Sequence, residues 1–326
     1  MGFRSFFSNR QKAFERFWMR PVDSRVYALV RIAFALSALY NWQKLWPHRQ
    51  ALFSDRAMTD LGIVAASTKD TFFFSVFYHF HSPDAVTAVF LAAFLALVCL
   101  GAGVFTRTAA ALAFVFHLSY SYRAFHVTHG WDVLLRVIAL VLLFSPISRA
   151  WSVDHWRRNQ RRSRRIGNVA QQVSTLSPAY GLVLLQLQLV VMYVTTAWQK
   201  LGDSFWRSGD MMGFYFMSMY SRFPSAFFAE HAWLSQLATY FTLFTEIALP
   251  VLLYHTRYRW LAFVLGFALH LGIGVMSPLW EFTFPTLTLY LAFLTGTDIA
   301  RIERWVQRRS RGPSKSPRGG LKATQS

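Results

Sequence analysis

The sequence predicts an all-α fold, a polytopic transmembrane helical bundle of about eight spans with both termini cytoplasmic. Three observations predict it. Hydrophobic residues make up 54% of the 326 residues and charged residues only 15%, against about 25% charged in soluble domains. The apolar residues stand in long blocks, several near the ~20 residues that cross a bilayer. The Lys and Arg residues flank these blocks, as they do in membrane proteins.

The N-terminal segment, residues 1–20, is expected to be a basic amphipathic helix lying in the headgroup plane. Its apolar stripe and the basic residues between are Phe3, Phe7, Phe14, Phe17, Arg4, Lys12, Arg16 and Arg20. A disordered basic tail is the alternative. The segment has no apolar core of the kind found in a cleavable signal peptide.

Residues 21–296 are expected to form the membrane domain. The predicted spans are residues 25–46, 84–105, 107–122, 131–147, 178–201, 232–254, 259–277 and 279–296. The short link at 106–108 makes the second and third spans a helical hairpin. Residues 297–326 are rich in Arg, Ser, Pro and Gly, and we expect a basic, mostly disordered cytoplasmic tail.

Two loops on the expected outer side are unusually apolar, residues 71–80 and 211–228. Irregular backbone inside a membrane is tolerated only where protein or water covers it. The outer half is therefore the better place to expect a cavity, with an ordinary aromatic belt as the alternative.

The distribution of basic residues supports the topology. With the N-terminus inside, 24 Lys and Arg residues fall in inside segments, 7 in outside loops and 3 within spans. The net charge of +19 is explained by these flanks, so nucleic acid is not an expected partner. The arginine-rich segment 156–165 either binds anionic lipids or serves as a topological anchor alone.

Ionisable residues inside spans are costly and therefore deserve a functional explanation. They are Arg31, Lys44, His117, Arg136, Lys200, Glu246, His270 and Glu281. Arg31 and Glu246 have similar depths, so a buried ion pair is expected between them. Asp132 and Arg136, spaced i,i+4, are expected to bond along their own helix. Lys44 can reach water from the outer boundary.

Lys200 ends the fifth span and is the candidate catalytic base, because partial burial favours loss of a lysine's proton. The alternative is a lysine that reaches the headgroups with Asp203 as its partner. His126 and His129 stand in a loop on the same expected face. No metal-binding motif is present, and Cys99, the only cysteine, excludes a disulfide within the chain and thiol-based quinone reduction.

Four segments, in order, resemble the HTTM membrane domain shared with vitamin K-dependent gamma-carboxylases. They are the Arg31 span with Phe53-Ser54-Asp55, residues 122–146 with His129-Gly130-Trp131-Asp132, residues 197–209 with Lys200 and Trp206, and residues 245–285 with Glu246 and His270. The resemblance covers roughly residues 20–296.

The resemblance implies a lysine base that deprotonates a reduced quinone, and Lys200 stands at the matching position. The animal enzyme has a lysine pair where this chain has Gln199-Lys200, and its loop histidine falls near His129. Only about 30 residues follow the last expected span, which argues against carboxylation of peptides. The family's small bacterial members imply the bacterial inner (plasma) membrane as the location.

The expected function is therefore action on a quinone or another lipophilic substrate at the outer membrane half. Lys200 would be the base, His129 or His126 an auxiliary proton donor or orienting group, and Glu246 a structural or proton-relay acid. A quinone-like ligand is the implied cofactor or substrate, and the bilayer is the implied partner. The alternative is a non-catalytic scaffold or a small transport component.

Overall fold

The computed structural model describes residues 11–12, 14–67, 74–166 and 176–310. Within this part the chain forms 15 α-helices, short 3-10 turns and one pair of strands, so the all-α prediction is confirmed. Eight helices correspond to the predicted spans: α2 (Ser24–Leu45), α5 (Pro83–Ala102), α6 (Thr106–Arg123), α7 (Gly130–Phe144), α9 (Tyr180–Gly202), α13 (Ala232–Tyr254), α14 (Arg259–Met276) and α15 (Trp280–Tyr290).

Shorter elements connect these helices or extend from them. The helices are α3 (Arg49–Phe53), α4 (Leu61–Ser67), α8 (Val153–Ile166), α10 (Ser204–Ser208), α11 (Met211–Met217), α12 (Phe227–Glu230) and α16 (Gly296–Ser310). The 3-10 turns are η1 (Trp46–His48), η2 (Val76–Tyr78), η3 (Phe125–Val127) and η4 (Leu291–Phe293). The strands β1 (Pro21–Asp23) and β2 (Leu176–Pro178), which the sequence analysis did not anticipate, pair antiparallel.

Four of the helices are long and apolar enough to cross a membrane: α5, α9, α13 and α14. The remaining four are shorter or more polar. α7 has 15 residues and, at 1.5 Å per residue, is shorter than a hydrocarbon core of about 30 Å. α15 has 11 residues before it tightens into η4.

Helix ends follow from local sequence. Ser82 caps α5 by accepting a hydrogen bond from the Ala85 amide, and Pro83 occupies the first turn, where a missing N–H costs nothing. Gly103 ends the helix in the left-handed conformation (φ 71°), which glycine adopts without strain. The tight turn that follows makes α5 and α6 the predicted hairpin.

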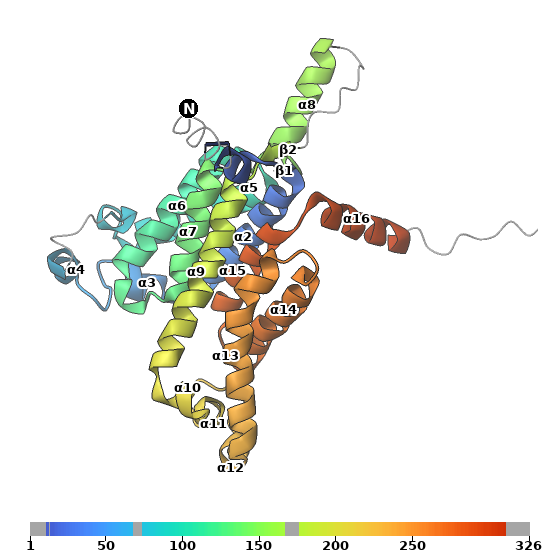
Figure 1. The fold of residues 1–326 in the computed structure, drawn as a ribbon. Helices are drawn as coiled ribbons and strands as arrows, with labels where there is room; N and C mark the ends of the chain where they lie inside the picture. Colours follow the sequence, from blue (N-terminus) through green and yellow to red (C-terminus); the bar gives the residue numbers. More distant parts are fainter. Residues whose placement is uncertain (1–10, 13, 68–73, 167–175, 311–326) are drawn as a thin grey trace, which may run out of the picture.

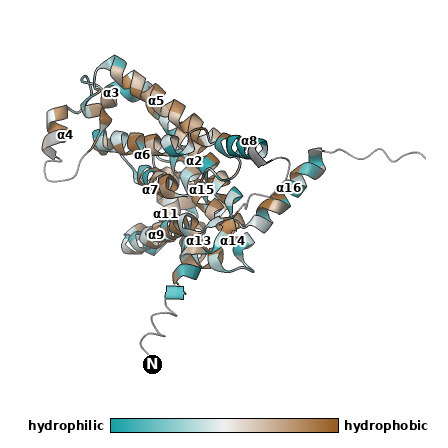
Figure 2. Cartoon of the chain, turned by 90° about the horizontal axis from the view of Figure 1, so that it is seen from above, coloured by the Kyte–Doolittle hydropathy of each residue, from teal (hydrophilic) through white to brown (hydrophobic). Residues whose placement is uncertain are grey.

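The core lies where α2 packs against α5 and α15, with α6, α7 and α9 around it. α9 and α13 run side by side away from this core to α10, α11 and α12 (Figure 1). The strands lie at the opposite end, and α8 and α16 project from that end. In Figure 2, α8 stands out as strongly hydrophilic.

Arg31 is fully buried on α2. Its guanidinium donates to the carbonyl oxygens of Ile147 and Trp151, both at 2.6 Å, and of Gly101 at 3.3 Å. One cation thus joins the end of α5 to the segment between α7 and α8, where carbonyl groups have no partner within a helix. The predicted ion pair between Arg31 and Glu246 is therefore wrong. The Arg31 guanidinium binds backbone carbonyl groups, and Glu246 pairs with Lys200 instead.

Both ends of the chain fall partly outside the described residues. Residues 11–12 and 14–19 are helical and expose Phe14 and Phe17, whereas Phe3 and Phe7 of the predicted amphipathic stripe lie outside the description. Residues 297–310 of the expected tail belong to helix α16, and residues 311–326 lie outside the description. The apolar loop 71–80 is described only from residue 74 onward.

Candidate functional site

A cavity of about 530 Å³ lies between α9, α13 and α14, and the segment that carries α10 and α11 lines one side of it. Its walls are mostly apolar, and four lining residues come from the loop 211–228 that the sequence analysis singled out: Met211, Met212, Tyr215 and Phe216. A volume of this size lies within the range that takes a drug-sized ligand. The polar residues in its wall include Lys200, Glu246, Tyr193 and His270.

Lys200 and Glu246 pair with each other in the wall of this cavity. The Lys200 Nζ lies 2.6 Å from each carboxylate oxygen of Glu246. The side chain of Glu246 is 8% exposed and that of Lys200 is 21% exposed. The ammonium also lies 4.3 Å from the ring centroid of Trp206, a distance typical of cation–π attraction. Lys200 is therefore held between a carboxylate and an aromatic face, and Asp203 is not its partner.

The chain turns sharply after Lys200, and this turn places Trp206 over the ammonium. Asp203 caps α10 by accepting a hydrogen bond from the Trp206 amide at 3.2 Å. Gly209 then adopts a left-handed φ of +84° against Gln236, and its carbonyl accepts bonds from Ser235 at 2.9 Å and Thr239 at 3.0 Å. The loop is thus fixed to α13, the same helix that supplies Glu246.

A chain of buried polar groups forms another part of the wall. The Tyr193 hydroxyl lies 2.6 Å from both the His270 Nε2 and the Tyr290 hydroxyl. The His270 Nδ1 is buried and has no hydrogen-bond partner among the described residues. Tyr193 and His270 both line the cavity. An unpaired buried nitrogen is costly.

The structure brings Lys200 and Glu246 together but places His126 and His129 elsewhere. Both histidines are exposed and neither lines the cavity. His126 lies 3.4 Å from the Thr59 hydroxyl, and the His129 ring packs against Trp131 with centroids 4.3 Å apart.

Asp132 does not bond along its helix to Arg136 as predicted. It accepts hydrogen bonds from the backbone N–H of His129 at 2.7 Å and from the Tyr120 hydroxyl. The guanidinium of Arg136 lies instead 5.7 Å from the ring centroid of Tyr122. The prediction failed because the carboxylate caps the first turn of α7, where amide groups are free.

The sequence analysis listed His270 and Glu246 as ionisable residues in spans but did not connect Glu246 with Lys200. The connection depends on how α9 packs on α13, which spacing along one helix does not reveal. Among the described residues, no group of three or more His, Cys, Asp or Glu side chains is arranged to hold a metal ion.

Comparison with known proteins identifies one family. The model of the HTTM domain matches residues 19–296, a range that contains every residue of the cavity. Neither the curated proteins nor the solved structures include a match to the chain.

Proposed function

The chain belongs to the HTTM domain family, and from this premise we propose that it is a membrane protein acting on a quinone or another lipophilic substrate. The observation that carries the proposal is the pair of Lys200 and Glu246 in the wall of a largely apolar cavity. An apolar ligand with one or two oxygen atoms suits such a site, because the walls take the ring or chain while the few polar groups orient the oxygens.

Lys200 acts in this proposal as a general base toward a substrate hydroxyl. A proton can pass from the Lys200 Nζ to Glu246, since the two groups are 2.6 Å apart, and this leaves a neutral amine. The amine then takes the proton of the substrate hydroxyl, and the resulting ammonium stabilises the oxyanion at close range. The cation–π contact with Trp206 stabilises the ammonium before and after the proton transfer.

His270 and Tyr193 supply a second polar contact for the substrate, because the Nδ1 of His270 has no protein partner among the described residues. His126 and His129 take an auxiliary part. Both are exposed at the loop between α6 and α7, where they can exchange protons with water or orient polar groups of a substrate at the membrane surface.

We further propose that the eight helices that correspond to the predicted spans all cross the bilayer, with both termini and α8 on the cytoplasmic side of a bacterial inner membrane. The charge bias along the sequence supports this orientation. It places Lys200 in the outer half and brings the arginines of 156–165 close to anionic lipids of the inner leaflet.

A non-catalytic scaffold or small transport component is the competing function, and one observation favours it. The pair of Lys200 and Glu246 ties α9 to α13, so the lysine could be present for assembly alone. A catalytic function requires that Lys200 release its proton, whereas a scaffold requires only its positive charge. A substitution by arginine separates the two requirements.

Lys200→Arg is the deciding variant. Arginine keeps a cation for Glu246 and Trp206, but it does not release its proton at physiological pH. We expect the variant to fold with unchanged thermal stability, to retain the ligand that co-purifies in mild detergent and to lose the cellular phenotype that the wild-type gene complements. Mass spectrometry of the extracted lipids and quinones identifies the ligand. Full complementation by Lys200→Arg would establish the scaffold instead.

A further inference from the structure

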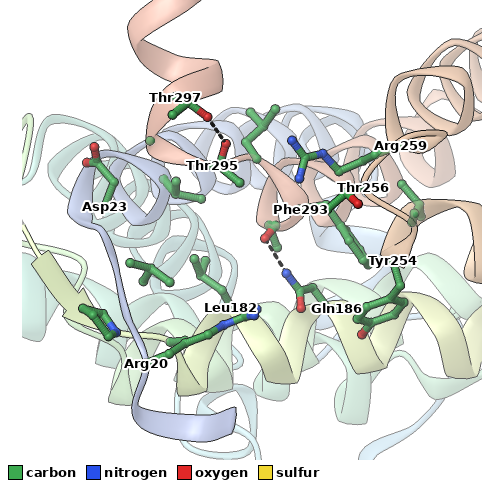
Figure 3. Close-up of a pocket in the computed structure, with 18 of the residues that line it drawn as sticks. Arg20, Asp23, Leu182, Gln186, Tyr254, Thr256, Arg259, Phe293, Thr295 and Thr297 are labelled. Atoms are coloured by element: carbon green, nitrogen blue, oxygen red, sulfur yellow. Dashed lines mark hydrogen bonds between the residues drawn. The ribbon is translucent and has the colours of Figure 1, made fainter. Parts of the chain in front are cut away.

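A second cavity, of about 630 Å³, lies at the other end of the molecule from Lys200. Figure 3 shows it where the start of α2, the start of α9, the end of α13, the start of α14 and the segment leading into α16 meet. The lining residues of this cavity are all different from those of the cavity that contains Lys200.

The depth of this cavity in the membrane follows from the helix ends around it. Four membrane helices begin or end around it, so in a bilayer the cavity lies where hydrocarbon meets headgroups. We call its apolar lining residues, among them Val26, Leu182, Leu253 and Phe293, the floor. We call its polar lining residues, among them Arg20, Thr256, Arg259 and Thr297, the rim. A molecule that carries both an apolar chain and a polar group therefore matches the lining.

The rim presents donors from opposite sides. In Figure 3, Arg20 enters from the β1 side and Arg259 from α14. The Arg259 terminal nitrogen donates to Asp298 at 2.8 Å, but its Nε is buried and has no partner among the described residues. The hydroxyls of Thr256 and Thr297 also line the space.

The carboxylates at this end are already engaged. Asp23 accepts four hydrogen bonds from Arg25, and Arg25 also pairs with Glu303 at 2.6 Å. Asp298 is held by Arg259 and by the Thr295 amide at 2.9 Å. Within the described residues, Arg20 is the lining cation that makes no ion pair.

We propose that this cavity binds the phosphate group of a membrane phospholipid, with the first part of an acyl chain along the apolar floor. The phosphate would accept hydrogen bonds from Arg20 and from the free Nε of Arg259, because charge-assisted bonds from guanidinium to phosphate are strong and geometrically defined. A soluble phosphate would satisfy the same donors, but it would leave the apolar floor uncovered.

The test is native mass spectrometry of the full chain in mild detergent. The probes are dioleoyl-phosphatidylethanolamine, dioleoylglycerol with the same chains and no phosphate, and inorganic phosphate. Phosphatidylethanolamine has no net charge, so general attraction to the arginines of α8 is small. The variants are Arg20→Gln and Arg259→Lys, which keeps a cation beside Asp298. Arg257→Gln, an exposed arginine that does not line the cavity, is the matched control.

We expect one phosphatidylethanolamine to bind at saturation, with affinity about tenfold weaker in Arg20→Gln, about fivefold weaker in Arg259→Lys and unchanged in Arg257→Gln. Dioleoylglycerol should bind far more weakly. If phosphate alone binds with the same dependence on the variants, the phosphate site stands and its source is soluble. Equal binding of both lipids, or equal effects of all three variants, would overturn the proposal. Thermal unfolding of each variant checks that it is folded.

Discussion

Lys200 and Glu246 form an ion pair in which each residue offsets the free-energy cost of burying the other's charge in the membrane. Glu246 is 6% exposed as a residue, and its charge would be expensive there without a cation. Lys200 is less buried and also contacts Trp206. The consequences of breaking the pair should therefore differ between its two members.

Glu246→Gln should lower the free energy of unfolding by about 2 kcal/mol. Removing one partner of a fully buried pair typically costs about 3–5 kcal/mol. The cost should be smaller here because the Lys200 ammonium can still reach solvent. Lys200→Met should cost more, since it strands the more buried carboxylate. The double variant should cost less than the sum of the two single variants. Thermal or denaturant unfolding in detergent measures all three, and additive costs would show that the contact is not energetically coupled.

Asp154 offers a residue-level prediction outside the membrane helices. Burial alone would raise its pKa, but hydrogen bonds from the Thr106 hydroxyl, the Thr106 amide and the Phe105 amide outweigh burial and hold the pKa below its usual range. A carboxyl whose pKa is lower in the folded state stabilises the protein above its unfolded pKa of about 3.9. That contribution is lost as the pH falls through the folded pKa.

Asp154→Asn should therefore lower thermal stability at neutral pH, and the difference from wild type should shrink as the pH falls below about 4. Asp84→Asn, which changes an exposed residue in the first turn of α5, is the control for general acid effects. A difference between Asp154→Asn and wild type that stays constant with pH would show that the cap does not depend on its charge.

At the scale of elements, the contact between α14 and α15 positions the buried polar chain beside the cavity. Gly266 on α14 lies so close to Tyr290 on α15 that an added Cβ would overlap the tyrosine ring. Tyr290 in turn lies 2.6 Å from the Tyr193 hydroxyl. The close approach of the two helices thus depends on the missing side chain.

Gly266→Ala should destabilise the protein by about 1–3 kcal/mol through overpacking, even though alanine is the better helix former. Gly272→Ala in the same helix has open space around it, so it should be neutral or slightly stabilising. Unfolding of both variants under one condition makes the comparison. Equal effects would mean that α14 and α15 move apart without cost.

Much of the element order could be predicted because apolar blocks of membrane length are visible in the sequence, and α9 and α13 agree with their predicted spans within two residues at each end. α16 was missed because its basic composition is also typical of disordered tails. The contacts of Arg31 and Lys200 could not be predicted, because each one joins segments far apart in sequence. The partner of Asp132 was predicted wrongly for a local reason, because its carboxylate caps the first turn of α7. Periodicity describes one helix at a time and carries no information on which neighbour meets it.

At the scale of the whole molecule, the two cavities lie at opposite ends of the helices, so orientation decides which side of the membrane each one serves. The charge bias predicts α8 inside and α11 outside. Labelling with an impermeant thiol reagent on intact cells, in a background where Cys99 is replaced, can determine it. A cysteine at Met219, which is 88% exposed, should be labelled directly.

A cysteine at Ser163 on α8 should be labelled only after the cells are opened. Both positions lie in exposed segments, so differences in reagent access within the fold do not confuse the result. Labelling of Ser163→Cys in intact cells, with protection of Met219→Cys, would invert the topology and place Lys200 in the inner half.

The carbonyl cluster around Arg31 has a consequence for biosynthesis. Helix α2 leaves the ribosome before the groups that bind Arg31. Gly101 lies 70 residues after Arg31, and Trp151 lies 120 residues after Arg31. Throughout that interval the nascent helix carries a cation whose insertion into hydrocarbon costs about 2.5–3.5 kcal/mol. α2 should therefore wait beside the translocon or at the headgroups until residues 147–151 have been made, so that it becomes locked in place only after later helices of the chain have been synthesised.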